Sequence, residues 1–128
     1  MKVHHIGYAV KCIDKALEKF KQLGYTEETE VVKDDIREVY IKFIINDGYR
    51  IELIAPSGEN SPINKTIKKG STPYHICYEV DDIYTSIEEM SKIGYTLFKE
   101  VQIAPAIDNR KVAFLFSRDI GLVELLEK

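Results

Sequence analysis

Four residues able to bind a metal ion occur at matching places in the two halves of the chain. His5 opens the segment His5-Ile6-Gly7-Tyr8-Ala9-Val10, and His75 opens the similar segment His75-Ile76-Cys77-Tyr78-Glu79-Val80. Each half closes on a matching glutamate, in Ile51-Glu52-Leu53-Ile54 and in Val123-Glu124-Leu125-Leu126. Imidazole nitrogen and carboxylate oxygen are good ligands for Zn²⁺, Ni²⁺ and Co²⁺. The repeat therefore predicts a metal site assembled from two copies of a half-site.

Strand alternation selects the histidine of the first half. Residues 3–10 are rich in β-branched and aromatic side chains, which is typical of a strand. Successive side chains of a strand point to opposite faces, so His4 and His5 lie on different faces. The repeat selects His5, and not His4, as the counterpart of His75.

The two glutamates need a partner. Glu52 and Glu124 each lie between apolar neighbours. Burying an unpaired carboxylate is costly in free energy, and a divalent ion would supply the partner. A bound cation stabilises a developing enolate oxygen, and a glutamate beside it can move a proton. The residue types therefore indicate proton transfer next to a metal-bound oxygen.

The elements that must position these residues repeat as well. An apolar stripe at helical spacing runs from Ile13 to Leu23 and another from Ile83 to Ile93, and Gly24 and Gly94 follow them as helix-ending residues. Asn46-Asp47-Gly48 indicates a hairpin, and Ser61-Pro62 predicts the capped start of a short helix. Eight strands are expected, at 3–10, 25–32, 38–45, 49–54, 74–80, 95–101, 111–116 and 122–126. Each half is thus a β-α-β-β-β module.

Length, net charge and hydropathy limit the class of protein. A chain of 128 residues is one domain by length, with module one at about 1–56, a linker at about 57–72 and module two at about 73–128. The net charge of −3 gives no attraction to nucleic acid or an anionic membrane, and no apolar run approaches the roughly 20 residues of a membrane span. The polar N-terminus does not read as a signal peptide, and Cys12 and Cys77 are expected as free thiols. These features predict a cytoplasmic protein.

In its repeated segments and in the four His and Glu residues, the chain resembles members of the vicinal oxygen chelate superfamily, which includes glyoxalase I. The resemblance covers the whole chain. It implies an α+β fold in which two βαβββ modules form an eight-stranded open cup, the glyoxalase/bleomycin-resistance/dioxygenase fold. It also implies that His5, Glu52, His75 and Glu124 hold one divalent ion per site, with Ni, Co or Zn as candidates. A homodimer is expected.

The His-Glu-His-Glu set is similar to that of glyoxalase I, also called lactoylglutathione lyase. This similarity implies a metal-dependent carbon–sulfur lyase of methylglyoxal detoxification. Such an enzyme isomerises the hemithioacetal of methylglyoxal and a thiol to a lactoyl thioester through a metal-bound enediolate. Glu124 is the expected base, with Glu52 serving the other face of the substrate.

Alternatives within the superfamily remain open. The linker 56–63 and the late strand 111–115 look like those of methylmalonyl-CoA epimerase, whose substrate is an acyl thioester, although Gln is usual there at the position of Glu52. A non-catalytic small-molecule binding or resistance protein is a further alternative. Dioxygenases and thiol transferases of the superfamily often use two His and one Glu, which would leave Glu52 without a role.

Several other residues are weaker candidates. Lys65, Lys68 and Lys69 could meet the carboxylates of glutathione or the phosphates of CoA, although a solvated face explains them as simply. Cys77 is expected to pack as a small apolar side chain. The remaining candidates for substrate contact or acid–base chemistry are Arg37, Glu38, Arg50, Arg110 and Lys111.

Overall fold

The structure is a computed structural model that describes residues 1–128. It contains nine strands and few helices, an α+β composition as predicted. The chain divides into two compact units. The N-terminal unit is His5–Tyr74, and the C-terminal unit is His75–Lys128 together with Met1–His4. None of the helices is long and apolar enough to cross a membrane.

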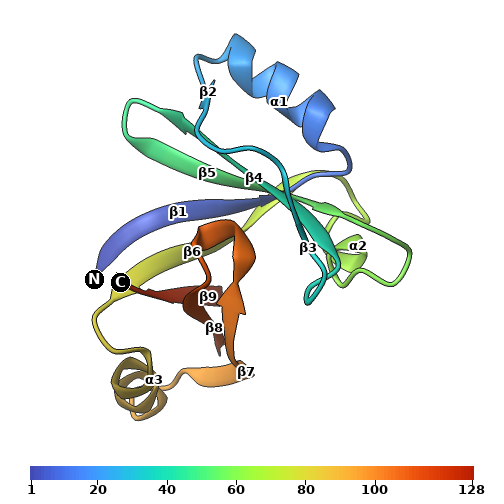
Figure 1. The fold of residues 1–128 in the computed structure, drawn as a ribbon. Coiled ribbons are helices and arrows are strands. Elements are labelled where there is room, and N and C mark those ends of the chain that lie inside the picture. The colour runs from blue at the N-terminus through green and yellow to red at the C-terminus, as the bar shows by residue number, and fades with distance from the viewer. The chain divides into compact units, whose positions relative to one another are not determined.

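The N-terminal unit is built around β5. This strand runs parallel to β1 and antiparallel to β4, and β4 also pairs with the short strands β2 and β3 (Figure 1). The elements are β1 (Lys2–Ala9, of which residues 5–9 belong to this unit), α1 (Ile13–Gln22), β2 (Thr26–Glu27), β3 (Val32–Asp34), β4 (Val39–Asn46), β5 (Tyr49–Pro56) and α2 (Ile63–Thr66).

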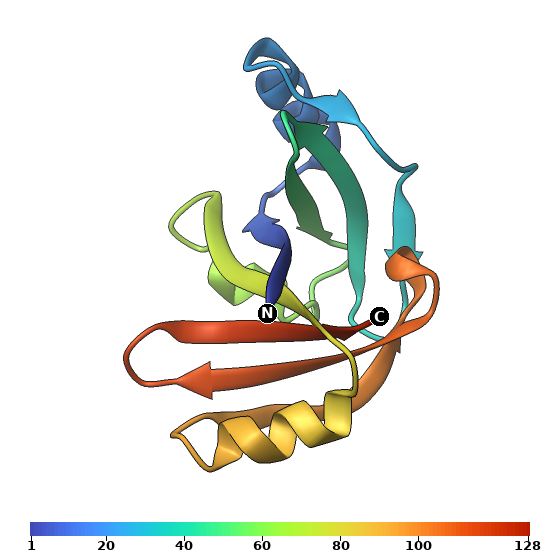
Figure 2. The same cartoon turned by 90° about the vertical axis from the view of Figure 1, so that its left-hand side faces the viewer.

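The C-terminal unit follows the same plan around β9. This strand is parallel to β6 and antiparallel to β8, and β7 pairs with the other side of β8 (Figure 2). The elements are β6 (Thr72–Val80, of which residues 75–80 belong to this unit), α3 (Ile83–Ser91), β7 (Thr96–Ala104), a 3₁₀ turn at Pro105–Ile107, β8 (Arg110–Ser117) and β9 (Gly121–Glu127).

Each unit buries the apolar stripe of its own helix against its own strands. In the N-terminal unit, Ile13, Ala16, Leu17 and Phe20 pack with Ile44, Ile51 and Leu53. In the C-terminal unit, Ile83, Ile87 and Met90 pack with Ala113, Leu115, Val123 and Leu125. The last members of the expected stripes, Leu23 and Ile93, are 69% and 73% exposed. The stripes are shorter than predicted because α1 and α3 end before these residues.

The chain has nine strands because the expected strand at 25–32 is interrupted. Only Thr26–Glu27 and Val32–Asp34 pair with β4. Between them, the backbone N–H groups of Glu28 and Thr29 both donate to the carbonyl oxygen of Phe43. Two donors on one acceptor break the regular ladder, so the segment forms two short strands in place of one.

The predicted hairpin turn is confirmed, but the predicted cap at Ser61 is wrong. Asp47 and Gly48 adopt left-handed φ values of 50° and 80°, as a tight hairpin between β4 and β5 requires. Asp82 caps α3 by accepting a hydrogen bond of 2.8 Å from the backbone N–H of Thr85. Ser61, however, does not cap α2, because Pro62 occupies the cap position.

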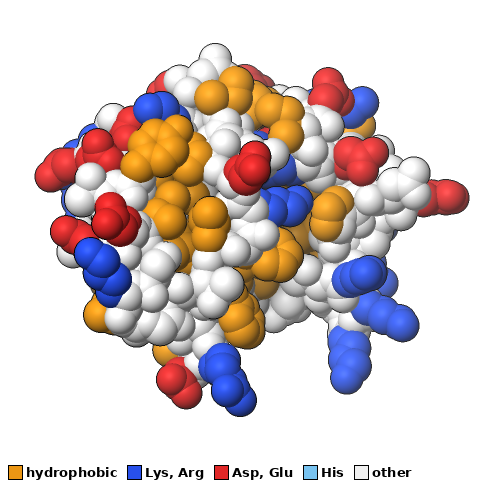
Figure 3. All heavy atoms as spheres, turned by 90° about the horizontal axis from the view of Figure 1, so that it is seen from below, with side chains coloured by type: hydrophobic (Ala, Val, Ile, Leu, Met, Phe, Trp, Pro, Cys, Tyr) orange, Lys and Arg blue, Asp and Glu red, His pale blue; other side chains and the backbone are white.

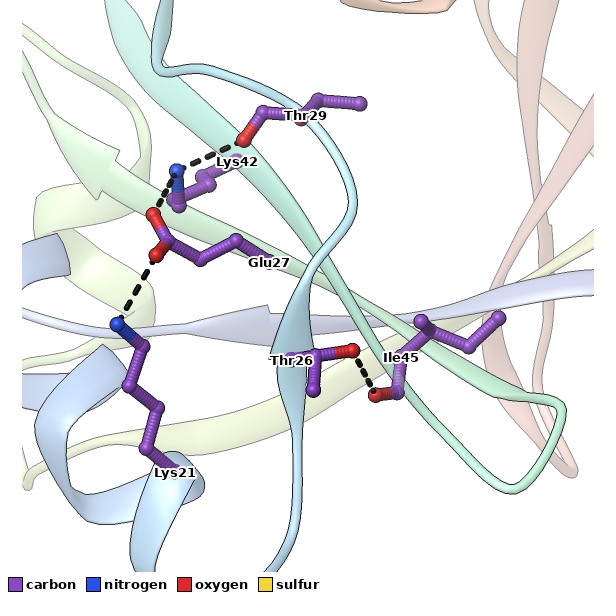
Figure 4. A network of polar contacts seen from close by, with 6 residues as sticks. All are labelled: Lys21, Thr26, Glu27, Thr29, Lys42 and Ile45. Carbon is purple, nitrogen blue, oxygen red and sulfur yellow. Dashed lines mark hydrogen bonds and ion pairs between the residues drawn. The ribbon is translucent and has the colours of Figure 1, made fainter.

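A buried lysine fastens β2 to β4. The Nζ atom of Lys42 donates to the carbonyl oxygen of Thr29 at 2.7 Å and pairs with Glu27 at 2.8 Å, and Lys21 reaches the same carboxylate at 2.9 Å (Figure 4). The hydrogen bond from Lys42, followed by that from Lys21, lowers the pKa of Glu27 from 4.5 to about 2. This network links α1, β2 and β4 without involving the residues predicted to bind metal.

Candidate functional site

The N-terminal half-site consists of His5 on β1 and Glu52 on β5. These strands are parallel, and Gly7 lies opposite Glu52 in the register. His5 is two residues before Gly7 and therefore shares its face. The Nε2 atom of His5 lies 3.4 Å from Oε1 of Glu52, and both side chains are buried.

The C-terminal half-site consists of His75 on β6 and Glu124 on β9. The strands are again parallel, and Cys77 lies opposite Glu124. The Nε2 atom of His75 lies 2.8 Å from Oε2 of Glu124, and both residues are buried. The structure therefore brings each predicted histidine together with the glutamate of its own half.

A phenylalanine supports each histidine ring. Phe43 lies opposite Glu52 in the β4–β5 ladder, and Phe114 lies opposite Glu124 in the β8–β9 ladder. Phe43 meets the His5 ring edge-on at 5.2 Å between ring centroids, and Phe114 meets the His75 ring in the same way at 5.4 Å.

Sequence reasoning missed both phenylalanines. The signal that could have found them is the strand before each repeated glutamate, Ile41-Lys42-Phe43-Ile44 in one half and Val112-Ala113-Phe114-Leu115 in the other. An aromatic residue at the same position of both strands is part of the repeat. In both halves its ring packs edge-on against the imidazole of the half-site.

The donor set of each half-site fits a divalent metal ion. The donor atoms of each His–Glu pair lie within 4.8 Å of one another. They are imidazole nitrogens and carboxylate oxygens, which suit the same range of ions. Each carboxylate lies between two buried apolar neighbours, where a cation would compensate its negative charge.

His4 and Cys77 have other environments. Burial acts to raise the pKa of Glu79, but the hydrogen bond from Arg110 and the nearby charge of His4 lower it below its usual value. His4 therefore contributes to the electrostatic surroundings of Glu79. Cys77 is a fully buried free thiol, which agrees with the expected role as a small packed side chain.

Most of the weaker cationic candidates are held by the protein itself. Arg110 donates to Glu79 at 3.0 Å and to the carbonyl oxygen of Glu127 at 2.8 Å, and Lys111 lies 3.5 Å from the Glu127 carboxylate. The other two arginines form the pairs Arg37–Asp34 at 2.6 Å and Arg50–Glu28 at 2.7 Å. These contacts give all four cations a structural role.

Glu38, Lys65, Lys68 and Lys69 are exposed and lie outside the two half-sites. Glu38 is in a turn with a left-handed φ of 55°, where its carbonyl oxygen accepts a hydrogen bond from the backbone N–H of Ser57. On the face drawn in Figure 3, most acidic and basic side chains lie towards the edge, hydrophobic side chains gather nearer the centre, and a group of basic side chains projects at the lower right.

Most of the sequence matches the model of one protein family. Residues 4–114 match the Glyoxalase/Bleomycin resistance protein/Dioxygenase superfamily. The chain belongs to this superfamily, which confirms the resemblance drawn from the repeated segments.

The relatives found within the superfamily point to one activity. The chain is 30% identical to human mitochondrial methylmalonyl-CoA epimerase, over 97% of this chain and 72% of the relative. It is 27% identical to an ethylmalonyl-CoA/methylmalonyl-CoA epimerase of Cereibacter sphaeroides, over 97% of this chain and 96% of the relative. These relatives are enzymes.

Solved structures match over nearly the whole chain. A hypothetical protein from Bacillus halodurans C-125 has a TM-score of 0.87 and 31% identity, over 99% of this chain and 94% of that one. Methylmalonyl-CoA epimerase from Mycobacterium tuberculosis has a TM-score of 0.85 and 25% identity, over 98% of this chain and 87% of that one.

The prediction of a glyoxalase I, a lactoylglutathione lyase of methylglyoxal detoxification, is therefore wrong. The curated relatives are epimerases, which was the stated alternative. The error came from letting Glu52 decide the substrate. A His–Glu donor set serves proton transfer beside a carbonyl oxygen in both reactions, so it does not distinguish a hemithioacetal from an acyl thioester. The linker and the late strand resembled the epimerase and were the better guides.

Proposed function

We propose that this protein is an acyl-CoA epimerase that inverts the carbon next to the thioester carbonyl of methylmalonyl-CoA or a close homologue. The observation that carries the proposal is a buried glutamate held against a histidine in each unit, at 3.4 Å and 2.8 Å. The epimerase relatives, matched over nearly the whole chain, supply the substrate class.

The proposal includes one divalent ion held by His5, Glu52, His75 and Glu124. Each half-site offers two donors, whereas such ions take at least four ligands. One ion shared by both half-sites, with water or substrate completing the shell, satisfies this requirement. When bound, the ion would polarise the thioester carbonyl and so acidify the neighbouring C–H group.

The glutamates would carry the proton. Inversion requires a base on one face of the substrate carbon and an acid on the other. We assign Glu124 as the base that breaks the C–H bond, with the electron pair moving to the carbonyl oxygen to form an enolate. Glu52, which would leave the ion while it carries a proton, would then give that proton to the opposite face of the carbon as the carbonyl re-forms. One turnover leaves Glu124 protonated and Glu52 ionised, and proton exchange with solvent restores the starting state. In the reverse direction the two residues exchange roles.

The test is a two-substrate assay with metal analysis on the purified protein. The expected result is inversion of (2S)-methylmalonyl-CoA in D₂O with deuterium entering at the inverted carbon, and no isomerisation of a methylglyoxal hemithioacetal. Elemental analysis should find about one divalent ion per chain, and a chelator should remove both ion and activity. A metal-loaded protein that exchanges no deuterium would refute the proposal.

The homodimer and the cytoplasmic location stay predictions. Light scattering on the purified protein measures its mass in solution, and a mass of one chain would contradict the dimer.

A further inference from the structure

Three lysines form an unpaired basic cluster next to α2. Lys65, Lys68 and Lys69 are exposed and form no ion pair. Glu59 is the single acidic residue between Glu52 and Glu79, although the chain as a whole carries a net charge of −3. The segment is therefore locally positive in an acidic protein.

This basic cluster stands on an anchored segment. Ile63 and Ile67 are each 6% exposed and hold α2 against the unit, where it packs on β5. The side-chain amide of Asn64 donates to the carbonyl oxygens of Gly58 at 2.9 Å and Glu59 at 3.1 Å, which closes the loop before the helix. The lysine backbones are thus fixed, and their side chains extend into solvent.

The cluster follows the strand that carries Glu52. Every second residue of a strand lies on the same face, so Glu52, Ile54 and Pro56 share one face of β5. At about 3.3 Å per residue, the end of β5 lies roughly 13 Å from Glu52. A long, flexible ligand whose reacting end lies at Glu52 could therefore reach α2 with its far end.

Ser61 supplies a second polar group in the same segment. Its side chain is buried, and its hydroxyl has no hydrogen-bond partner within the chain. A buried hydroxyl normally has at least one partner. The segment that carries the cluster thus also holds an unused hydrogen-bonding group.

We propose that Lys65, Lys68 and Lys69 bind the phosphate groups of the CoA part of the substrate. The inference rests on the proposed function and names the part of the chain that recognises the nucleotide end. A lysine ammonium is a compact charge on a flexible stem, and it suits phosphate groups that need charge more than fixed geometry. The basic cluster holds the far end of the ligand while the half-sites act on the acyl end.

The test is direct binding of CoA and of pantetheine, which lacks the phosphates, to the full-length protein by calorimetry. The variant K65Q/K68Q/K69Q should bind CoA about 10-fold more weakly, because three exposed charge pairs are lost. Its affinity for pantetheine should not change. The matched control is K11Q/K15Q/K19Q, which removes three exposed, unpaired lysines near or on α1 in the same unit. The control should bind CoA like the unaltered protein.

The outcomes separate this inference from the proposed function. Lysine-dependent CoA binding without epimerisation would support the cluster and contradict the epimerase. Epimerisation with an unchanged KM for acyl-CoA in the variant would overturn the binding role of the three lysines. It would not contradict the proposed epimerase function. Equal losses in variant and control would show a non-specific charge effect and overturn the inference, as would a lack of CoA binding by the unaltered protein. The conservative variant K65R/K68R/K69R should restore CoA binding.

Discussion

The two half-sites use the same strand pairs but differ in their detailed contacts. His75 lies 2.8 Å from Glu124, whereas His5 lies 3.4 Å from Glu52. The residue opposite the glutamate is Cys77 in the C-terminal half-site and Gly7 in the N-terminal one. The two half-sites therefore differ both in the residue opposite the glutamate and in the His–Glu distance. The strand register brings the same residue types together in both halves, although the distance between them differs.

The difference continues on the far face of the strands. Lys42 and Ala113 immediately precede the two phenylalanines, and both are buried. Ala113 joins the apolar core under α3, whereas Lys42 is tied to Glu27 and Thr29. The duplication thus preserves the face that carries His, Glu and Phe and lets the opposite face diverge.

The largest expected effect is on catalysis, where the two glutamates should prove unequal. E124Q should lower kcat by roughly 10²–10⁴-fold, the usual contribution of a general base, with the metal still bound. E52Q should reduce inversion but still allow deuterium exchange at the substrate carbon, because the first proton transfer remains. Exchange and inversion are measured together by NMR in D₂O. Near-normal turnover of metal-loaded E124Q would contradict the assignment of the base.

The next effect is on stability, where the two phenylalanines should differ. Phe43 is 3% exposed, and Phe114 is only half-buried. F43A should cost about 3–5 kcal/mol in the free energy of unfolding, as for other buried aromatic truncations, and F114A should cost less. Urea unfolding monitored by circular dichroism measures both. Equal losses of unfolding free energy in F43A and F114A would mean that the difference in burial does not affect how much each ring stabilises the fold.

The smallest effect concerns pH and belongs to the N-terminal unit alone. The pKa of Glu27 is lowered from 4.5 to about 2 by Lys42 and Lys21, so its ion pairs stabilise the folded state above pH 4.5. This contribution is lost as the pH falls from 4.5 towards 2. The unaltered protein should therefore lose more stability than E27Q between pH 6 and pH 3, measured by urea unfolding at each pH. Equal losses of stability in the unaltered protein and E27Q would show that the exposed Glu27 carboxylate does not stabilise the fold.

The sequence predicts the half-sites because their geometry follows from periodicity. Alternation along the first strand selects His5 over His4, and the repeat matches His5 with His75 and Glu52 with Glu124. Both helices and the hairpin at Asn46-Asp47-Gly48 are local features, so stripes and turn residues reveal them.

The features that the sequence did not predict depend mostly on contacts between residues far apart in the chain. Nothing within residues 25–32 shows that Glu28 and Thr29 will share one acceptor on β4 and interrupt the strand. The supporting role of Phe43 depends on its partner across the ladder. Substrate class is not encoded in the ligand residues at all, because the same donors serve more than one proton transfer.

Each His–Glu pair spans two neighbouring parallel strands, and everything between the two residues is helix, outer strand and loop. Insertions and deletions in that intervening chain change the rim of the unit while the register keeps the pair together. The two halves already illustrate this, because the C-terminal one contains a 3₁₀ turn before β8 that the N-terminal one lacks. The architecture can therefore acquire new loops, and with them new substrates, without losing its chemistry. It also supports grafting, since a loop from a relative could be transplanted between β7 and β8 with His75 and Glu124 left in place.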